Sequence, residues 1–367
     1  MADVLLLSRY ERLGASSRVR SYQFLPALAA AGIEVEVCPM FDDAYLRARH
    51  AGSWPIGRVL SSYARRIRDA IVHRKEPVVW LEYELLPWVP YALERMLLDS
   101  DRALVIDYDD AIFHRYDCHR NGIVRALLRD KIDRLMRAAS VVIAGNQYLA
   151  ARAHAAGARR VELLPSVIDL SRYRQKDDRS ADAGFTIGWI GSPYSTRYLR
   201  SLEPVLRQLG DVPGLSLINV GGTAWQPAGI TVENRPWTED TEVSEMLRFD
   251  VGVMPLANEP WERGKCGFKL VQYMGCALPV VASPVSANAE IVEHGRTGFL
   301  AATTREWSDA LCALAADPDL RARMGAAGLE RCRTRYSLSV VAPRLVAILR
   351  DALAEAKSRG IAAGSSQ

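Results

Sequence analysis

Short apolar runs alternate with helical patterns along most of the chain, and this alternation constrains the fold more than any other feature. The runs are continuously aliphatic or β-branched, which is typical of strands buried on both faces of a parallel sheet. The segments between them have helical spacing, and the helix predicted over residues 20–31 ends at Gly32, a residue type suited to a helix C-terminus. The sequence therefore predicts an α/β fold with doubly wound parallel sheets.

The alternation occurs twice, and a polar segment separates the two occurrences. Residues 171–184 contain almost no aliphatic side chains, which is typical of a linker between domains. Strands are predicted before this segment at 3–8, 34–39, 78–81, 103–107, 140–144 and 161–164, and after it at 186–190, 215–220, 231–233, 251–254, 279–282 and 298–300. The other long helices are predicted over 123–139, 198–209, 268–276 and 338–357.

A chain of 367 residues accommodates two ordinary domains, so we predict two Rossmann-like domains that face a cleft. The predicted parts are an N-terminal domain over 1–172, a linker over 173–184, a C-terminal domain over 185–337, a helix over 338–357 and a flexible tail over 358–367.

The composition, with 49% hydrophobic and 25% charged residues, is that of a soluble globular protein. We find no run of about 18 uncharged apolar residues, and the first predicted strand follows Met1 almost at once. We therefore expect neither a transmembrane helix nor a signal peptide. The six cysteines show no CxxC spacing, so a zinc site or a disulfide framework is not expected. They are interpreted as buried filler in a protein of the reducing cytoplasm.

The net charge of +4 comes from the first 176 residues, because the remainder is slightly negative. A mildly basic half is compatible with anionic ligands or with an anionic membrane surface. It is too weak to indicate nucleic-acid binding, and no basic–aromatic repeat supports that function. We therefore expect no nucleic-acid partner.

A basic, glycine-containing segment enters the helix predicted over 268–276. Arg263, Lys265 and Lys269 crowd this helix start, with Gly267 between the two lysines. The amide groups at a helix start favour anions, so cations there are explained if a diphosphate lies between them and the helix. The alternative is a solvated basic loop.

Glycine turns follow the first predicted strand of each half. Gly14 lies in the first turn, and Gly191 and Ser192 lie in the second, where backbone N–H groups could face a phosphate. Neither turn is a full GxGxxG motif, so a dinucleotide site is poorly supported.

Three acids gather where the strand predicted over 103–107 ends, namely Asp107, Asp109 and Asp110. Clustered carboxylates at a strand end are costly unless they bind a cation, a substrate hydroxyl or an arginine. The structural alternative is that Asp110 caps the next short helix and Asp107 pairs with a neighbouring arginine. His114 follows closely and adds a further polar group.

The segment 58–75 carries Leu60, Tyr63, Ile67 and Ile71 at helical spacing, with arginine and lysine at other positions. Such a helix could lie on an anionic bilayer, or it could pack its apolar side on the core with a solvated basic face; the second interpretation is the commoner one. Four nearby aromatic residues could line an apolar acceptor site, although core packing is favoured for most of them: Trp80, Tyr83, Trp88 and Tyr91.

Several segments carry a resemblance to a known family. They are 145–149, 165–169, 250–256, 264–283 and 290–300. With them the chain resembles glycosyltransferase family 4, the retaining enzymes of the GT-B fold that use sugar nucleotides, over about residues 3–357. In this family the last helix, here after Tyr336, crosses back to the first domain.

The resemblance implies a nucleotide-diphosphate sugar bound by the C-terminal domain and a glycan or lipid-linked acceptor bound by the N-terminal domain. Reaction would occur in the cleft, with no cofactor and no tightly held metal. It also implies a role in cell-envelope or exopolysaccharide synthesis, in the cytoplasm, with a possible peripheral contact at the inner face of an anionic membrane.

The family usually has two glutamates eight positions apart, and the corresponding positions here are Gly264 and Gln272. The resemblance then assigns the diphosphate to Lys265, Lys269 and the remaining basic and glycine residues of both turns: Gly14, Gly191, Ser192, Arg263, Gly267 and Phe268. Gln272 and Glu290 would contact ribose or the donor sugar, and Trp237 would contact the base.

A His-Asp pair of the family aligns with Asp109 and Asp110, so the histidine is replaced by an acid. Asp109, Asp110 or His114 would then contact the acceptor and act in catalysis. Two rival functions remain. One is a GT-B sugar-nucleotide epimerase, and the other is a non-catalytic scaffold that only binds a nucleotide.

Overall fold

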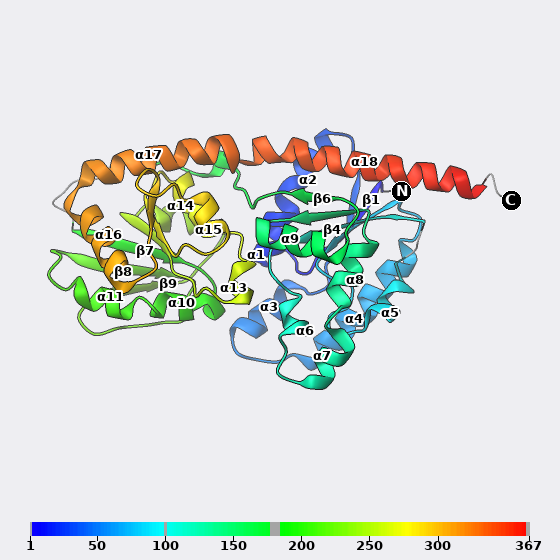
Figure 1. Cartoon of the computed structure of the whole chain (residues 1–367), viewed down its shortest axis with the longest axis horizontal. Coiled ribbons are helices and arrows are strands. Elements are labelled where there is room, and N and C mark those ends of the chain that lie inside the picture. Colours follow the sequence, from blue (N-terminus) through cyan, green and yellow to red (C-terminus); the bar gives the residue numbers. More distant parts are fainter. Residues whose placement is uncertain (1, 99–100, 177–183, 365–367) are drawn as a thin grey trace. The chain divides into compact units, whose positions relative to one another are not determined.

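The chain folds into two compact units, each with its own parallel sheet (Figure 1). The structure is a computed structural model, and it describes residues 2–98, 101–176 and 184–364. Unit 1 comprises residues 1–166 and 341–367, and unit 2 comprises residues 167–340.

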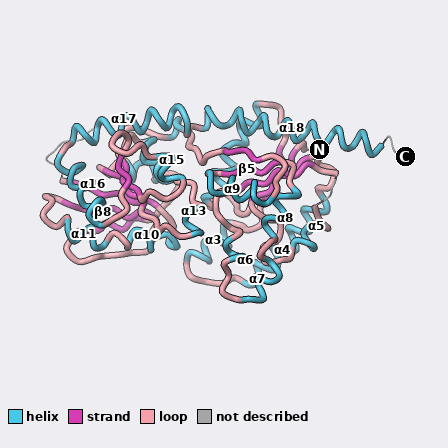
Figure 2. The backbone as a smooth tube through the Cα atoms, in the orientation of Figure 1, coloured by secondary structure: helices cyan, strands magenta, loops and turns pink. Residues whose placement is uncertain are grey.

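The sheet of unit 1 has six strands, all parallel to their neighbours, with helices around it (Figure 2). The inner strands are buried and mainly aliphatic, as in β4 (Ala103–Tyr108), whose six residues are all buried, whereas the two outer strands are partly exposed. In spatial order they are β2 (Val35–Val37), β1 (Val4–Leu7), β3 (Val78–Glu82), β4 (Ala103–Tyr108), β5 (Val141–Ala144) and β6 (Val161–Leu163).

The helices of unit 1 alternate with these strands, as a doubly wound fold requires. They are α1 (Ala15–Arg20), α2 (Leu25–Ala30), α3 (Asp43–His50), α4 (Ile56–Val72), α5 (Tyr91–Arg95), α6 (His114–Asp117), α7 (Gly122–Leu128), α8 (Lys131–Ala138) and α9 (Gln147–Ala156). A short 3-10 turn, η1 (Tyr22–Phe24), separates α1 from α2, so the helix predicted over 20–31 is divided.

Unit 2 has a second sheet of six parallel strands. In spatial order they are β12 (Gly298–Leu300), β11 (Val280–Ala282), β10 (Val251–Met254), β7 (Phe185–Ile190), β8 (Leu215–Val220) and β9 (Thr231–Arg235). Two apolar clusters cover its faces, and Phe249 and Tyr273 in one of them pack against the glycines of β7 and β10. The predicted α/β architecture with two Rossmann-like sheets is therefore confirmed.

The helices of unit 2 are η2 (Leu170–Arg172), η4 (Pro193–Ser195), α10 (Thr196–Arg200), α11 (Glu203–Gln208), α12 (Glu242–Met246), α13 (Pro260–Arg263), α14 (Phe268–Gly275), α15 (Ala287–Ile291), α16 (Thr304–Ala316) and α17 (Pro318–Arg335). The helix predicted over 198–209 is divided into α10 and α11, because Pro204 lies in the first turn of α11 and cannot donate to the preceding turn. The helix predicted over 123–139 is divided between α7 and α8.

The predicted domain boundary at residue 172 is too late by six residues. Ile168 packs in the core of unit 2, donates its N–H to Tyr336 O at 3.1 Å and accepts from Leu338 N at 2.8 Å. The predicted linker 173–184 also begins as structure, since Lys176 Nζ pairs with Asp250 at 2.7 Å. Residues 177–183 of that linker lie outside the described residues.

The last helix, α18 (Leu338–Gly364), continues through Pro343 and is longer than the predicted 338–357. Its later part belongs to unit 1, where Arg344 donates to Leu163 O at 2.8 Å and Arg350 donates to Ala31 O at 2.9 Å. The backbone of 358–364, expected as a tail, is helical, and 365–367 lie outside the described residues.

Candidate functional site

The acids at the carboxyl end of β4 have different environments. Asp107 is buried and forms an ion pair with Arg20 of α1, with an N–O distance of 2.9 Å. Burial raises the pKa of Asp107 to about 6, although the charge of Arg20 opposes this shift. The arginine pairing considered for Asp107 is therefore confirmed, and this acid holds α1 on the sheet.

Asp109 accepts a hydrogen bond from a residue that follows another strand. The hydroxyl of Tyr83, which follows β3, donates a hydrogen bond to Asp109 Oδ1 and lies 3.1 Å from Ser16 Oγ in α1. Tyr83 has φ of 64°, a region that a bulky residue rarely occupies and that is typical of functional sites. Tyr83 is thus a positioning candidate rather than ordinary core packing.

Glu82, the last residue of β3, is a functional candidate that the sequence analysis missed. Its Oε2 accepts from Arg9 N at 2.8 Å and from Ser17 Oγ at 2.6 Å, so it holds the turn between β1 and α1. Its Oε1 has no hydrogen-bond partner among the described residues. Burial raises the pKa of Glu82 to about 7, and the charge of Asp109 adds to this. The sequence feature that could have identified Glu82 is its position as an acidic residue directly at the end of a buried apolar strand.

His114 lies in a hydrogen-bonded group of its own. Its Nδ1 lies 2.8 Å from Asp117 Oδ1, and its Nε2 lies 2.8 Å from Tyr148 OH of α9. The suggested cap by Asp110 is wrong, because the residue before α6 is Phe113 and no side-chain cap is present there. Asp110 is half-buried, and its backbone oxygen accepts from Ile112 N.

A buried ionic network fixes the loop that carries Tyr83. Glu84 pairs with Lys131 of α8 at 2.7 Å and with Arg9 and Arg115 at 3.4 Å each. Burial alone would raise the pKa of Glu84, but these cations bring it below its usual value. Lys131 also pairs with Glu94 at 2.9 Å, so the first residue of α8 is drawn into the core by two acids.

Gly14 lies at the N-cap of α1, in unit 1. Its φ is −70°, so the glycine is not needed for its backbone conformation. A Cβ atom there would lie 2.3 Å from Tyr10 Cβ, so the absence of a side chain allows close packing in the turn.

In unit 2, the predicted phosphate residues lie around the start of α14. Gly267 precedes this helix with φ of 67°, a conformation that favours glycine. Lys265 Nζ lies 5.7 Å from the ring centre of Trp261, and Lys269 Nζ lies 5.5 Å from that of Trp189 in β7. Phe268, the first residue of α14, is half-buried.

The carboxyl ends of neighbouring strands in unit 2 bring together further predicted residues. Gly191 follows β7, and a Cβ on it would lie 2.4 Å from the ring of Trp189, the ring that Lys269 faces. Gly221 follows β8, and a Cβ on it would lie 2.5 Å from Gly191 O and 2.7 Å from Trp237 Cβ. Ser192 precedes η4 as its N-cap and donates its N–H to Ser195 Oγ. Gly191, Ser192, Lys269 and Trp237 therefore share one edge of the sheet.

Gln272 is buried at this edge and is already bonded within the protein. Its amide nitrogen lies 3.2 Å from Tyr173 OH and 3.2 Å from Glu242 Oε2, which also accepts from Trp237 Nε1 at 3.1 Å. Glu242 therefore links the predicted base residue to the predicted ribose residue. Glu242 was not predicted from the sequence, because only the fold brings it beside Trp237 and Gln272.

Two of the predicted site residues form their hydrogen bonds with residues outside the group around Lys269 and Gln272. Arg263 is exposed and donates to Asn258 Oδ1 at 2.9 Å. Glu290 was expected in a loop but lies in α15, exposed, with its backbone oxygen accepting from Arg331. Asn288 of the same helix was missed; it is buried near Gly267, and its Oδ1 lacks a partner within the described part of the chain.

Two groups of side chains could hold a metal ion among the described residues. The first is Glu36, Cys38 and His73, and the second is His114, Asp117 and Cys118. In the second group both imidazole nitrogens are engaged in hydrogen bonds, so it is better described as a hydrogen-bonded group. Neither group lies in unit 2, which contains the residues predicted to bind the diphosphate around α14.

Helix α4 does not pack as the commoner interpretation of its sequence predicts. Arg66 and Asp69 are buried, whereas Leu60 and Ile71 are 67% and 46% exposed. The buried guanidinium of Arg66 donates to Cys38 O at 3.1 Å and to Ser8 O, so the polar face packs on the sheet. The core-facing interpretation is therefore wrong for the apolar face of this helix.

The predictions for the aromatic residues and the cysteines are confirmed only in part. Trp80 is buried in the core as favoured, while Trp88 is about half-exposed and packs on Tyr116 at a ring distance of 5.3 Å. All six cysteines are free, and four are buried; Cys118 and Cys312 are exposed, so filler is the wrong description for these two.

Comparisons with known proteins agree with this architecture. Residues 187–317 match the model of a family described as Glycosyl transferases group 1. An alpha-maltose-1-phosphate synthase of Mycolicibacterium smegmatis is 35% identical over 108 residues, which cover 27% of each chain. A D-inositol 3-phosphate glycosyltransferase of Stackebrandtia nassauensis is 29% identical over 177 residues, which cover 42% of this chain and 37% of the relative. The chain thus spans well under half the length of these curated relatives.

Solved structures show the likeness over nearly the whole chain. Sucrose-phosphate synthase from Thermosynechococcus elongatus has a TM-score of 0.72 at 17% identity, covering 96% of this chain and 100% of that chain. HepE from Anabaena, in complex with UDP-glucose, has a TM-score of 0.68 at 17% identity, with the same coverage. At such identities the likeness shows the fold, and the fold is GT-B.

The protein is therefore a GT-B protein with two Rossmann-like units. The resemblance seen in the sequence is confirmed, because residues 187–317 match the group 1 glycosyltransferase family model and the fold is GT-B.

Proposed function

We propose that this protein is a retaining glycosyltransferase that moves a sugar from a nucleotide-diphosphate sugar to an acceptor hydroxyl. The observation that carries the proposal is the convergence of Gly191, Lys269 and Trp237 at one edge of the unit 2 sheet. Ligands of parallel sheets bind at the carboxyl ends of the strands, and this edge lies within the family match. Unit 2 would bind the donor, and unit 1 would bind the acceptor.

Each group has a defined chemical task in this proposal. Lys265, Lys269 and the amides of the Gly191–Ser192 turn would stabilise the charge that develops on the departing nucleoside diphosphate. Trp237 would contact the base, and Gln272, Glu242 and Glu290 would contact or position ribose and sugar. Asp109, Asp110 or His114 would orient the acceptor hydroxyl, with Tyr83 as the positioning residue.

The substitution Lys269→Ala tests the phosphate role. It should lower turnover by about 100-fold or more, because one lost charge stabilisation in a transition state costs several kcal/mol. The assay measures release of nucleoside diphosphate from each sugar nucleotide, with Lys357→Ala on the exposed face of α18 as the control. Unchanged turnover in Lys269→Ala, with the fold intact, would contradict the assignment.

The same assay separates the rival functions. An epimerase would convert the sugar nucleotide with no acceptor present, and a scaffold would bind nucleotide without turnover under any acceptor. The transferase requires both substrates. Because HepE is solved in complex with UDP-glucose, that sugar nucleotide is a reasonable first donor to test.

We further propose a glycan or lipid-linked acceptor in cell-envelope or exopolysaccharide synthesis, used in the cytoplasm at the inner face of the membrane. One curated relative is a phosphatidyl-myo-inositol mannosyltransferase, and it is 39% identical over 84 residues. No helix in the described part of the chain is both long enough and apolar enough to span a bilayer. A peripheral contact would therefore have to use surface side chains.

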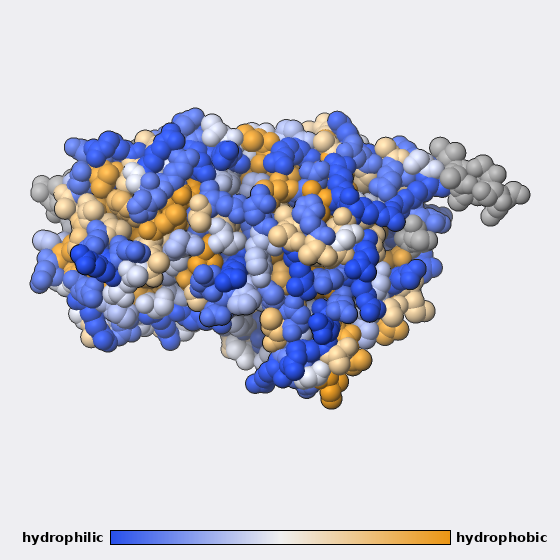
Figure 3. Space-filling model, viewed as in Figure 1, coloured by the Kyte–Doolittle hydropathy of each residue, from blue (hydrophilic) through white to orange (hydrophobic). Residues whose placement is uncertain are grey.

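The apolar face of α4 supports such a contact with an anionic bilayer. Its exposed residues are Ile56, Leu60, Ile67, Ile71 and Val72, and Trp54 just before the helix is exposed as well. Arginines flank this face on the same helix, as on amphipathic helices that bind anionic lipid. Figure 3 shows further apolar side chains at the end of unit 1 formed by α7, where Ile123 and Leu127 are exposed.

Vesicle sedimentation tests this contact. The protein should bind vesicles that contain phosphatidylglycerol and not pure phosphatidylcholine, and added salt should weaken the binding. The double variant Leu60→Ser, Ile71→Ser should lose most of the binding, and Val340→Ser in unit 2 should keep it. Binding that is equal in all three proteins would contradict the α4 contact.

A further inference from the structure

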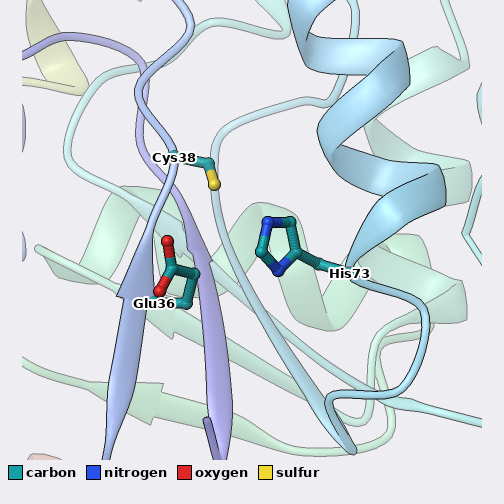
Figure 4. A group of neighbouring side chains, drawn as sticks. All are labelled: Glu36, Cys38 and His73. Carbon is teal, nitrogen blue, oxygen red and sulfur yellow. The ribbon is translucent and has the colours of Figure 1, made fainter. Parts of the chain in front are cut away.

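Three side chains that commonly bind metals converge beside the edge strand β2 of unit 1 (Figure 4). Glu36 and Cys38 are two residues apart in an extended segment, so they lie on the same face of it. His73 follows the last residue of α4. A carboxylate oxygen, the sulfur and a ring nitrogen of these residues lie within 4.8 Å of one another.

The packing of α4 brings these residues together. Arg66, Asp69 and His73 lie on one face of the helical turns, and Arg66 donates to the backbone oxygen of Cys38 at 3.1 Å. Because this bond is buried, it fixes the helix over the end of β2. The packing of α4 on β2 therefore holds the backbone of His73 close to that of Cys38.

The imidazole of His73 is oriented as in histidines that bind metals. Its Nδ1 lies 3.3 Å from Glu76 Oε1, and the side chain of Glu76 is only 9% exposed. A carboxylate on one ring nitrogen fixes the tautomer and leaves the other nitrogen for a ligand. Figure 4 shows the ring turned toward the Cys38 sulfur. In the His114 group, by contrast, both ring nitrogens are already bonded.

The charges around the site suit a cation. The carboxylates of Glu36 and Asp69 lie near the Cys38 thiol, together with the cations of Arg66 and Arg68. Glu76 adds a third carboxylate, and its Oε2 has no hydrogen-bond partner among residues 2–98, 101–176 and 184–364. A divalent ion would offset this negative field and would stabilise a thiolate.

We propose that Cys38, His73 and Glu36 bind a zinc ion, with water as the fourth ligand. A sulfur, an imidazole nitrogen and one carboxylate oxygen are a zinc set, since Mg²⁺ and Ca²⁺ prefer oxygen ligands alone. Binding converts the thiol to a zinc thiolate and releases its proton to solvent, so binding tightens as the pH rises. The ion ties the end of β2 to the C-terminal end of α4.

This site is independent of the proposed transfer reaction. It was not expected from the sequence, because no CxxC spacing marks it and because His73 is separated from Cys38 by a helix. The role of the ion is structural, so its consequence is a more stable unit 1 rather than a faster reaction. Failure of either proposal therefore leaves the other intact.

Cobalt substitution tests the site directly, because a thiolate bound to Co²⁺ gives a charge-transfer absorption band. Untagged, metal-stripped full-length protein is titrated with Co²⁺ and then with Zn²⁺. We expect a band that saturates at one Co²⁺ per chain and is displaced by Zn²⁺. Zn²⁺ should also raise the melting temperature, and Mg²⁺ should not.

Matched variants assign the band to these residues. Cys38→Ser should abolish it, Cys118→Ser in the other group should retain it, and Glu76→Gln should weaken Zn²⁺ binding by about 10- to 100-fold. His73→Gln, at a side chain that is 25% exposed, gives a second test with little risk to folding. Absence of the band in the parent protein would overturn the proposal, as would a band that survives in both Cys38→Ser and His73→Gln.

Discussion

Two buried tyrosines near the acid cluster differ in the partner of the hydroxyl. Tyr83 OH donates to Asp109, whereas Tyr108 OH has no hydrogen-bond partner in the described part of the chain. Tyr83→Phe should lower turnover by roughly 10- to 100-fold, because a hydrogen bond to a charged group contributes about 1.5–3 kcal/mol. Steady-state kinetics with a working donor and acceptor measure this effect.

Tyr108→Phe is the matched control, and its kinetics should equal those of the parent protein. It removes a hydroxyl of the same chemistry one residue beyond Asp107, so it reports the effect of a buried ring change alone. Equal losses in the two variants would mean that Tyr83 acts only through packing. Loss of turnover in Tyr83→Phe alone supports the positioning role.

Glu82 gives a pH dependence to the stability of unit 1. Its pKa is raised from 4.5 to about 7, so the folded protein holds a proton that the unfolded chain releases. The resulting stabilisation is complete below about pH 4.5 and is lost as the pH rises through 7. Glu82→Gln removes this dependence, so its stability relative to the parent should rise by up to about 3 kcal/mol between pH 4.5 and 8.

Urea unfolding of both proteins at pH 4.5, 6 and 8 measures this difference. The raised pKa values of Asp107 and Glu94, to about 6 and about 7, act in the same pH window but are present in both proteins. They therefore cancel in the comparison. A stability difference that is the same at every pH would show that Glu82 is ionised in the folded protein across this range.

At the scale of elements, the strands were predictable and several helix limits were not. The strands of the described residues were recognised because most of them are short apolar runs, although β9 contains Glu233, Asn234 and Arg235. The break between α7 and α8 involves a distant partner, because Lys131, the first residue of α8, pairs with Glu84. The orientation of α4 depends on Arg66, whose partners Ser8 and Cys38 are far away in the sequence. The helical periodicity of the α4 sequence, taken alone, predicts that its apolar face packs on the core, whereas the structure exposes that face.

The strand β7 requires a glycine at position 188. A Cβ there would lie 1.9 Å from ring atoms of Phe249, which is fully buried in the core of unit 2. Gly188→Ala should therefore destabilise the protein by more than about 2 kcal/mol, because the core has no room to relax. Denaturant unfolding measures this loss.

Gly57→Ala in α4 is the matched control for that substitution. Among the described residues no atom lies within 4 Å of a Cβ at this helical position, so the change should stabilise the protein by about 0.5–1 kcal/mol. Equal effects at the two glycines would contradict the packing account of β7.

At the scale of the whole molecule, the sequence predicted two α/β halves and many residues of the candidate site. The phosphate residues could be proposed because Lys265, Gly267 and Lys269 are close in sequence, and the family resemblance supplied Trp237. Three further residues could not be proposed from the sequence, because each gains its neighbours only when separate strands and helices pack together. They are Glu82, Glu242 and Asn288. The early start of unit 2 at Val167 was missed for the same reason, since Ile168 pairs with residues near 336.

The central claim is that unit 2 binds a nucleoside diphosphate at the start of α14. The most direct test is thermal unfolding of the parent protein and Lys269→Ala with UDP, GDP, ADP and TDP. We predict that at least one nucleotide raises the melting temperature of the parent and that Lys269→Ala reduces this shift, since a ligand of the folded state stabilises by mass action. If no nucleotide shifts the parent, or if the variant shifts equally, the claim is contradicted.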